Sequence, residues 1–214
     1  MSELELIGPP QAPAVDGAPA EPTTALLIGA HPDDAEFSSA GTMAKWVAAG
    51  VHVVYVVVTS GDKGTADKTM TNARLSSTRE QEQLAAAREV GVEEVVFLRY
   101  PDGLVQPDLQ LRGDICRQIR RYRPYAVLVH DPITLFHGNQ FINHPDHRAV
   151  GTATVDAIYP TARDPLQYPE QITDEGLEPH KVKEIYLWGS EEPNVASDIS
   201  ETIDRKIAAL THHA

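Results

Sequence analysis

Hydrophobic and polar positions alternate along the chain in a pattern that predicts strands separated by helices. From residue 23 onward, short apolar runs are followed by longer segments in which apolar residues recur with the period of a helix. The expected strands are residues 25–29, 51–59, 94–99, 125–130 and 183–188. The expected helices are residues 38–49, 77–90, 109–121, a segment from His144 or Asp146 to just before Pro160, and a terminal helix from about residue 200. This order predicts β-α-β units and an α/β fold with a mostly parallel sheet.

The strand expected at residues 51–59 has the sequence VHVVYVVVT. A nearly continuous run of valines is typical of a strand that is buried on both faces. We therefore expect this strand near the centre of the sheet, with helices covering both faces.

The first 22 residues differ in composition from the rest of the chain. They contain five prolines and four alanines and show no periodicity. Such a segment cannot bury enough apolar surface to become ordered. We expect a disordered tail at residues 1–22 and a single domain at residues 23–214.

Acidic residues outnumber basic ones by 31 to 18, which gives a formal net charge of −13. This excess argues against a nucleic-acid partner, because a protein that binds a phosphate backbone needs a basic surface. The most apolar run, residues 51–58, is far shorter than the roughly 20 residues that a membrane span requires. The N-terminus lacks the basic and apolar regions of a secretory signal, and the single cysteine, Cys116, favours a reducing compartment. A cytoplasmic protein is expected.

Two polar clusters follow predicted strands, which is where ligands bind in open α/β sheets. The first is AHPDD at residues 30–34 and the second is NHPDHR at residues 143–148. Each cluster has two candidate ligands three residues apart, a spacing that puts them on one face at a helix start. Either cluster alone would suit a turn that caps a helix. Two such clusters at strand ends of one sheet favour a metal site, because burying these groups without a cation is costly.

A catalytic zinc ion usually takes three protein ligands from histidines and carboxylates and keeps one position for water. His31, Asp34 and His147 form such a set. We expect Zn²⁺, and since these ligands discriminate weakly among metals, Fe²⁺ or another divalent ion in its place stays open.

The remaining polar residues of the two clusters suit acid-base chemistry. Asp33 is next to a ligand without being one, so we expect it to remove a proton from the metal-activated water. His144, if charged, would stabilise the oxyanion and protonate the leaving group. Asp146 is expected to orient a histidine from outside the ligand set.

Both clusters resemble signatures of the PIG-L (LmbE-like) family of zinc-dependent N-deacetylases. HPDD at residues 31–34 is similar to the first signature and HPDH at residues 144–147 to the second, and the likeness extends from about residue 24 to the end. Further matching segments are TSGDKG at 59–64, Arg79 and Glu82, YPDG at 100–103 and LEPH at 177–180. The resemblance implies a Rossmann-like fold with helices on both faces of the sheet. It also implies hydrolysis of an N-acetyl group, commonly from an N-acetylglucosamine conjugate.

The resemblance implies the same ligands, base and acid histidine as the clusters do, and adds two substrate-binding residues. Arg79 and Asp102 would hold hydroxyl or phosphate groups of the substrate. As alternatives, Arg79 would form a salt bridge with Glu80 or Glu82, and Asp102 would be a turn residue. The chain departs from the family pattern at Ala35, where a glutamate is frequent, and at its end, where the family's chain continues beyond a C-terminal histidine.

Weaker candidates remain outside the two signatures. His130 and Asp131 end a strand and either reach the cleft or form a turn, and His137 lies in a long loop that could act as a lid. His52 is expected to be structural or exposed, and His180 to lie mostly at the surface. Cys116 falls on the apolar side of a helix, which predicts a core residue and not a nucleophile.

The sequence thus predicts a metal-dependent enzyme that deacetylates a small N-acetylated sugar conjugate. One alternative is an amidase that cleaves a bulkier thiol-conjugate or antibiotic amide on the same scaffold. A second is a non-catalytic, metal-bound sugar-binding protein, although such a protein would need neither Asp33 nor His144. The sugar or aglycone is not fixed by the sequence, and a homo-oligomer stays open.

Overall fold

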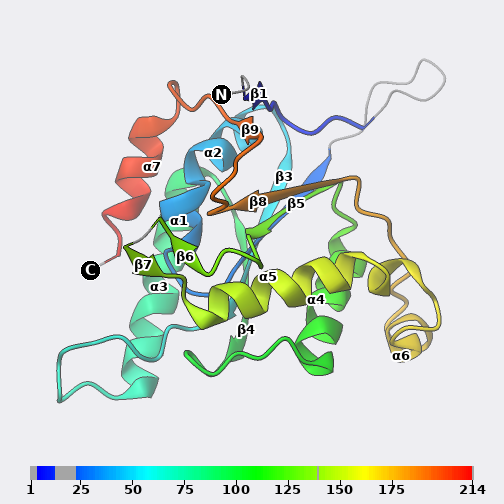
Figure 1. Ribbon diagram of the computed structural model, residues 1–214, viewed down its shortest axis with the longest axis horizontal. Coiled ribbons are helices and arrows are strands. Elements are labelled where there is room, and N and C mark those ends of the chain that lie inside the picture. Colours follow the sequence, from blue (N-terminus) through cyan, green and yellow to red (C-terminus); the bar gives the residue numbers. More distant parts are fainter. Residues whose placement is uncertain (1–3, 13–22, 139, 214) are drawn as a thin grey trace.

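A five-stranded parallel sheet forms the centre of the computed structural model, which describes residues 4–12, 23–138 and 140–213 (Figure 1). Its strands are β2 (Thr24–Gly29), β3 (His52–Thr59), β4 (Glu94–Tyr100), β5 (Ala126–His130) and β8 (Glu184–Trp188). They are arranged in the order β4-β3-β2-β5-β8, and every adjacent pair is parallel. The predicted α/β class and parallel sheet are confirmed.

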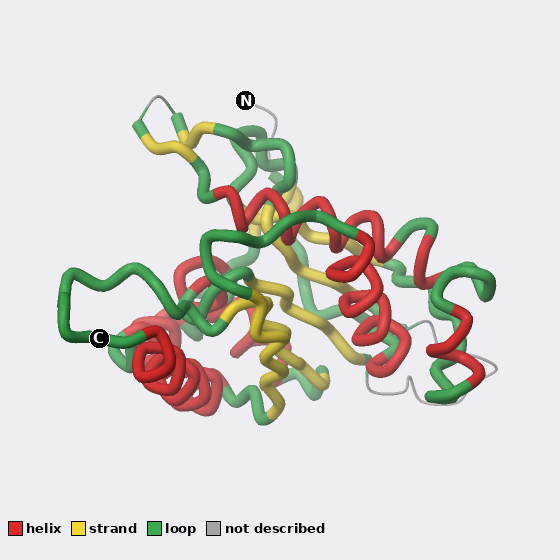
Figure 2. Tube along the Cα trace, turned by 90° about the horizontal axis from the view of Figure 1, so that it is seen from below, coloured by secondary structure: helices red, strands yellow, loops and turns green. Residues whose placement is uncertain are grey.

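Helices cover both faces of this sheet, as Figure 2 shows. On one face, α4 (Leu109–Tyr122) and α5 (Pro145–Ile158) pack Ile115 and Val150 against strand residues that include Ile28. On the other face lie α1 (Asp34–Ser38), α2 (Ala40–Ala48), α3 (Asn72–Val90) and α7 (Ile203–Leu210). There Trp46 and Val90 pack against a second set of strand residues that includes Leu27. Because successive strand residues point to opposite faces, the sheet separates two apolar cores.

The position of β2 determines where a ligand can bind. The chain leaves β2 toward β3 on one side, whereas β5 pairs with β2 on the other side. Leu27, for example, lies opposite Tyr55 of β3 and Leu128 of β5. Connections that run in opposite directions from neighbouring strands leave a crevice beyond their carboxyl ends. This crevice lies between the segments that follow β2 and β5.

Two predicted helices have different bounds in the structure. The helix expected at residues 77–90 begins at Asn72, where the hydroxyl of Thr71 accepts a hydrogen bond from the amide of Arg74. Its first turns are largely polar and exposed, so they carry no apolar period. The helix expected at residues 38–49 is divided into α1 and α2, because Ser39 between them has a non-helical backbone conformation, with φ −122° and ψ 1°.

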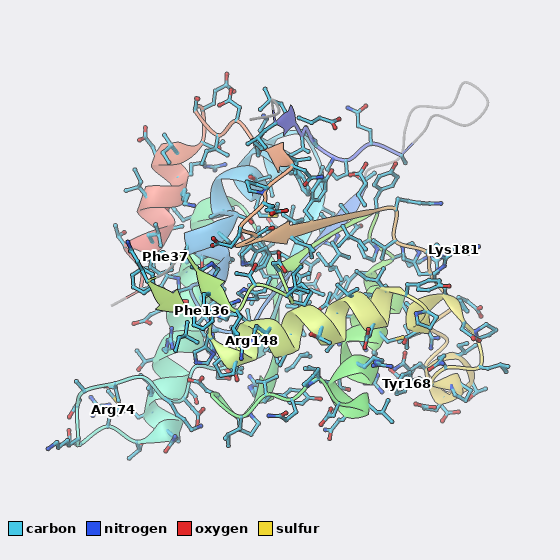
Figure 3. All side chains as sticks on the ribbon, viewed as in Figure 1. Phe37, Arg74, Phe136, Arg148, Tyr168 and Lys181 are labelled. Carbon is cyan, nitrogen blue, oxygen red and sulfur yellow. The ribbon has the colours of Figure 1, made fainter. Side chains whose placement is uncertain are left out.

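Short elements at the rim carried no periodic signal. The hairpin of β6 (Phe136–His137) and β7 (Phe141–Ile142) follows β5, and η1 (Thr161–Arg163) and α6 (Pro169–Thr173) follow α5. In Figure 3, Phe136 marks the hairpin, Arg148 marks α5 and Tyr168 marks the start of α6. Elements of two to five residues are too short to show a hydrophobic period.

Part of the predicted tail is ordered. β1 (Glu5–Leu6) pairs in parallel with β9 (Val195–Ala196), and the hydroxyl of Thr23 donates to the carbonyl of Pro10 over 2.7 Å. The proline-rich composition predicted disorder at residues 1–22. Composition contains no information about the backbone hydrogen bonds that β1 forms with β9, near the other end of the chain. Residues 13–22 of that tail lie outside the described residues.

Arg120 on α4 anchors the irregular segment after α5. Its side chain is 1% exposed, and its guanidinium donates to five backbone carbonyls and to the side-chain oxygen of Gln171. The carbonyls belong to Thr161, Ala162, Asp164, Gln167 and Tyr168. These bonds tie η1 and the start of α6 to α4.

Among the described residues, no helix combines the length and apolar character needed to cross a membrane.

Candidate metal centre

His31 and Asp34 come from the turn between β2 and α1. The chain leaves β2 at Gly29 and enters α1 at Asp34, so the turn is short and places both side chains beyond the end of the strand. Oδ2 of Asp34 accepts hydrogen bonds from the amides of Ala30 (2.8 Å) and His31 (2.7 Å). These bonds fix the carboxylate, and Nδ1 of His31 lies 3.7 Å from the same oxygen.

His144 and His147 come from the start of α5. His144 caps the helix, since its Nδ1 accepts a hydrogen bond from the amide of Asp146 over 3.2 Å, and Pro145 occupies the first helical position. His147 follows within the first turn, and its Nε2 lies 3.2 Å from Oδ1 of Asp34. The structure therefore brings the two predicted clusters together at the crevice between β2 and β5.

Each of the two predicted histidine ligands has one ring nitrogen held by an outer partner. Nδ1 of His147 donates to Oδ1 of Asn143 over 3.1 Å. The side-chain nitrogen of Asn143, Nδ2, in turn donates to the carbonyl of Thr134. Nε2 of His31 lies within 3.3 Å of two carboxylates, as described next. In both rings the other nitrogen faces Asp34.

Asp102 and Asp146 are the outer partners of His31. Nε2 of His31 lies 3.2 Å from Oδ1 of Asp102 and 3.3 Å from Oδ2 of Asp146. Asp146 is fully buried and also accepts the amides of Gly103 (2.7 Å) and Val105 (3.3 Å). Asp146 thus lies where it can orient His31, and that role stays a prediction. Imidazoles that donate outward to a fixed acceptor and point their second nitrogen inward are typical of metal ligands.

The chemistry of the donor set therefore fits a cation. Within the part of the chain that the structure describes, three groups of residues have ligand atoms within 4.8 Å of one another, and they overlap on the predicted ligands. They are His31 with His144 and His147, Asp34 with His130 and His147, and His31 with Asp102 and Asp146. The predicted set of His31, Asp34 and His147 lies where these groups meet.

The pKa values around the centre reflect buried opposite charges. Burial opposes the charged form of His31, but hydrogen bonds to Asp102 and Asp146 outweigh it and raise the pKa of His31 to about 10. Burial also opposes the carboxylate of Asp34, yet His130 and His147 hold its pKa well below the usual range. The hydrogen bond from His31 lowers the pKa of Asp102 to about 2. A cation bound here would take the place of the histidine proton.

His130, left open by the sequence, contributes to the centre. It ends β5 and is 5% exposed, and its Nε2 lies 3.0 Å from Oδ2 of Asp34. The indole of Trp188 on β8 donates to Nδ1 of His130 over 3.1 Å. Since Nδ1 accepts, Nε2 carries the proton of the neutral ring and donates to Asp34. Asp131 both lines the cavity beside the centre and forms a turn, accepting the amide of Ile133.

Asp33 faces a different set of partners from Asp34. Its carboxylate forms a salt bridge with Arg79 (Nη2 to Oδ2, 2.8 Å), and the same Nη2 donates to the carbonyl of Pro32 over 2.7 Å. Burial and the neighbouring charge of Asp34 raise the pKa of Asp33, Arg79 lowers it, and the resulting value is about 6. A carboxylate with this pKa can accept a proton near neutral pH.

Two predicted substrate contacts have partners within the protein. Arg79 pairs with Asp33, whereas Glu80, one of the alternatives, pairs with Arg99 and accepts from the hydroxyl of Ser60. Asp102 is 6% exposed, and beside His31 it accepts the amide of Lys63 over 3.1 Å.

His144 lies edge-on to His31, with ring centroids 4.6 Å apart. Burial and the neighbouring His31 lower the pKa of His144. The predicted acid role required a charged ring, and this environment favours the neutral form in the absence of substrate.

A cavity of about 400 Å³ opens beside the centre. Asp34, His130 and His147 form its floor, and the lining also includes His137 of the β6-β7 hairpin. Phe37 of α1, labelled in Figure 3, and Trp188 provide apolar walls. The cavity is much larger than an acetyl group, so it has room for a ring next to the reacting amide.

Other candidates lie away from the centre. The side chain of His52 is 54% exposed and near Glu94, and His180 hydrogen-bonds the carbonyl of Pro124. Cys116 is a buried free cysteine in the core, as predicted. Asn143 and Gln83, which the sequence did not single out, contact His147 and the backbone of Asp33. Asn143 precedes the second signature directly, whereas nothing in the local sequence marks Gln83.

Known proteins similar to this chain belong to one family. Residues 26–158 match the profile of the PIG-L family, described as GlcNAc-PI de-N-acetylase. The chain is similar to a diacetylchitobiose deacetylase of Thermococcus kodakarensis, with 30% identity over 188 residues that cover 88% of this chain and 68% of that protein. It is also similar to a mycothiol S-conjugate amidase of Streptomyces coelicolor, with 29% identity over 201 residues, 84% of this chain and 66% of that protein.

Among solved structures, the N,N'-diacetylchitobiose deacetylase of Pyrococcus horikoshii in complex with its inhibitor MPG has a similar fold. Its TM-score is 0.82 at 29% identity, and the match covers 90% of this chain and 70% of that chain. The chain thus spans about two thirds of the length of these three relatives.

Proposed function

This chain belongs to the PIG-L family of GlcNAc-PI de-N-acetylases, and on that premise we propose that it hydrolyses the N-acetyl group of an N-acetylglucosamine-type conjugate. The products are acetate and a free amine. The names of the Thermococcus and Pyrococcus relatives, both diacetylchitobiose deacetylases, support this substrate class. The cavity beside the centre provides room for the sugar ring.

The observation that carries the proposal is the inward orientation of three side chains. His31 and His147 each hold one ring nitrogen in an outer hydrogen bond and turn the other toward Asp34. This set suits Zn²⁺, with Fe²⁺ as the next candidate because imidazole and carboxylate also bind it. When bound, the cation supplies Lewis acidity, which acidifies a water molecule and polarises the amide carbonyl.

The residues of the chain supply the proton transfers. Asp33 accepts a proton from the attacking water while the oxygen of that water bonds to the carbonyl carbon of the amide. The C–N bond then breaks, and the amine nitrogen takes the proton from Asp33; the alternative donor, His144, requires its ring to be charged when substrate is bound. A hydrogen bond from His144 to the oxyanion stabilises the tetrahedral species between these two steps.

Arg79 is proposed to contact the substrate in addition to its salt bridge with Asp33. In the described part of the chain both of its hydrogen bonds use Nη2, so Nη1 remains to contact a hydroxyl or phosphate group. For Asp102, burial and the contacts with His31 and Lys63 support a role in orienting His31 more than direct substrate contact.

The test is metal content and acetate release on wild type and His147→Ala side by side. We expect about one zinc or iron per chain in the wild type and loss of both metal and activity in the variant. His52→Ala, which removes an exposed histidine, is the control and should change neither quantity. Wild-type protein that binds no divalent metal after reconstitution would refute the proposal.

A second candidate is cleavage of a bulkier amide. It is favoured by the similarity to a mycothiol S-conjugate amidase and by the size of the cavity. Comparing release of acetate from N-acetylglucosamine and diacetylchitobiose with release of larger acyl groups separates the two candidates. If only larger acyl groups are released, the amidase alternative holds. A metal-bound but catalytically inert protein would support the sugar-binding alternative.

A further inference from the structure

Asp33 has a backbone conformation that an L-residue adopts only when its surroundings impose it. Its φ is 100° and its ψ is −22°, in the left-handed region, at the residue before α1 begins. Such a conformation costs free energy and persists where other contacts hold it. The contacts that hold this peptide therefore determine where the carboxylate of Asp33 points.

Gln83 on α3 holds the peptide of Asp33. Its side chain is fully buried, and its Oε1 accepts the amide hydrogen of Asp33 over 2.9 Å. Its Nε2 donates to both carboxylate oxygens of Glu36, at 3.1 and 3.2 Å. Both oxygens of Glu36 accept from the same NH₂ group, so this end of the Gln83 amide faces Glu36. The oxygen of Gln83 must then face Asp33.

The side chain of Glu36, which orients Gln83, is itself held in place. It is fully buried on α1, and Nε2 of His213 lies 3.2 Å from its Oε2. The end of α1 is held in turn by Lys206 of α7, whose Nζ donates to the carbonyls of Phe37 (2.9 Å) and Ser38 (3.2 Å). The bridge from Glu36 to Asp33 thus starts from a helix that is itself anchored.

Arg79 and Gln83 act on Asp33 from the same helix. They are four residues apart on α3, so their side chains lie on one face. Arg79 binds the carboxylate of Asp33 and Gln83 binds its peptide nitrogen. Gly61 packs against this arrangement, since a Cβ at that position would lie 2.5 Å from Nη1 of Arg79.

We infer that Gln83 is a positioning residue that holds Asp33 in its left-handed conformation and so aims its carboxylate at the reaction centre. This role rests on the proposed function of Asp33 as the base. Gln83 forms no hydrogen bond with the three proposed metal ligands, all of which the structure describes, and it acts through the peptide of Asp33 and through Glu36.

The test compares two buried bridging glutamines. Gln83→Met keeps the size of the side chain and removes both hydrogen bonds. Gln171→Met is the matched control, because Gln171 is also fully buried, donates to the carbonyl of Gly113 (2.8 Å) and accepts from Arg120 (3.2 Å). Gln171 lies on α6 and bridges to α4, away from Asp33. We expect kcat of Gln83→Met to fall about 10- to 100-fold with KM and metal content unchanged. Gln171→Met should have a lower melting temperature than the wild type and an unchanged kcat.

Gln83→Asn is a second variant in case the methionine variant does not fold. It keeps the amide but is one methylene shorter, so it cannot reach both Glu36 and Asp33, and kcat should also fall. A wild-type kcat in a folded, metal-loaded Gln83 variant overturns the inference. Equal losses of kcat in the Gln83 and Gln171 variants also overturn it, because that result indicates general destabilisation.

Hydrogen exchange of the Asp33 amide separates this inference from the proposed function. In the wild type, this amide should be protected, and Gln83→Met should exchange it faster while Gln171→Met leaves its rate unchanged. Unchanged protection in Gln83→Met overturns the positioning role. If the wild type deacetylates no substrate, the proposed function fails, and the exchange rates still show whether Gln83 holds the peptide.

Discussion

Nε2 of His130 lies 3.0 Å from Oδ2 of Asp34 and links the end of β5 to the start of α1. The ring of His130 also stacks on that of His147, with centroids 4.0 Å apart and planes inclined by 14°. Trp188 on the next strand fixes the tautomer that makes the donation to Asp34. One histidine thus orients two of the three proposed ligands.

We therefore predict that His130→Leu weakens metal binding by about 10- to 100-fold, because Asp34 loses a donor that orients it. Competition with a chelator of known affinity measures the effect. His52→Leu is the control, since its ring is exposed and remote from the centre. Wild-type affinity in His130→Leu would show that the backbone amides alone orient Asp34.

Asp33→Asn should bind metal as the wild type does and lose about 10²- to 10⁴-fold in kcat, because the amide cannot accept the proton. Metal analysis and acetate release measure the two effects on the same sample. Asp67→Asn, in an exposed loop, is the control and should keep full activity. An active Asp33→Asn variant would exclude Asp33 as the base.

Gly151→Ala should destabilise the protein and weaken metal binding. A Cβ at this position on α5 would lie 2.5 Å from the carbonyl oxygen of His130 and 3.1 Å from Cα of Pro132. The helix must move away from β5, at a cost of about 1–3 kcal/mol, and it carries His147 with it. Urea unfolding and metal titration test this, with Gly8→Ala as the control because nothing lies within 4 Å of its Cβ. Unchanged stability would mean that α5 shifts freely.

Cys116 should resist alkylation in the native state at about pH 8, because burial raises the pKa of its thiol to about 11 from the ordinary value of 9.0. As the pH rises above 9, the thiol of the unfolded chain ionises first, so its contribution to stability falls until the native thiol ionises near 11. Iodoacetamide labelling with and without urea measures the first effect. Urea unfolding at several alkaline pH values measures the second, and Cys116→Ala should reduce the slope.

Arg120→Met should lower the free energy of unfolding by about 3 kcal/mol or more, because it removes the donor of five backbone carbonyls, two of which belong to the fully buried Thr161 and Ala162. Arg121→Met, next to it but 46% exposed and 3.8 Å from Glu175, should change stability by less than about 1 kcal/mol. Urea unfolding compares the two. Equal losses in both variants would indicate that the carbonyls find water in place of Arg120.

The strands and most helices could be predicted because their residues repeat with a period that burial imposes. The convergence of His31, Asp34 and His147 was also predictable, since both clusters follow strands whose carboxyl ends meet. The outer bonds were not predictable. Asn143 accepts a hydrogen bond from a ring nitrogen of His147, and Gln83 accepts one from the backbone amide of Asp33, which is far away in the sequence. Neither bond corresponds to a local sequence pattern.

The same limit explains why the sequence predicted neither the partner of Arg79 nor the pairing of the N-terminal segment. Arg79 and Asp33 are brought together by the packing of α3 beside the turn after β2, so the sequence offered Glu80 and Glu82 as equally good partners. The pairing of Glu5–Leu6 with Val195–Ala196 joins segments near opposite ends of the chain. A composition count over residues 1–22 contains no information about that partner.

The central position of β2 also determines when the proposed centre can assemble during synthesis. A nascent chain that ends before β5 has β2, β3 and β4, and with them Asp33, its α3 contacts and the ligands His31 and Asp34. It lacks the strand and helix that carry His130 and His147. Since domains emerge from the ribosome N-terminal end first, such a chain offers a cation only two of the three ligands. Capture of the metal therefore waits until β5 has inserted beside β2 and α5, with His147, has followed it.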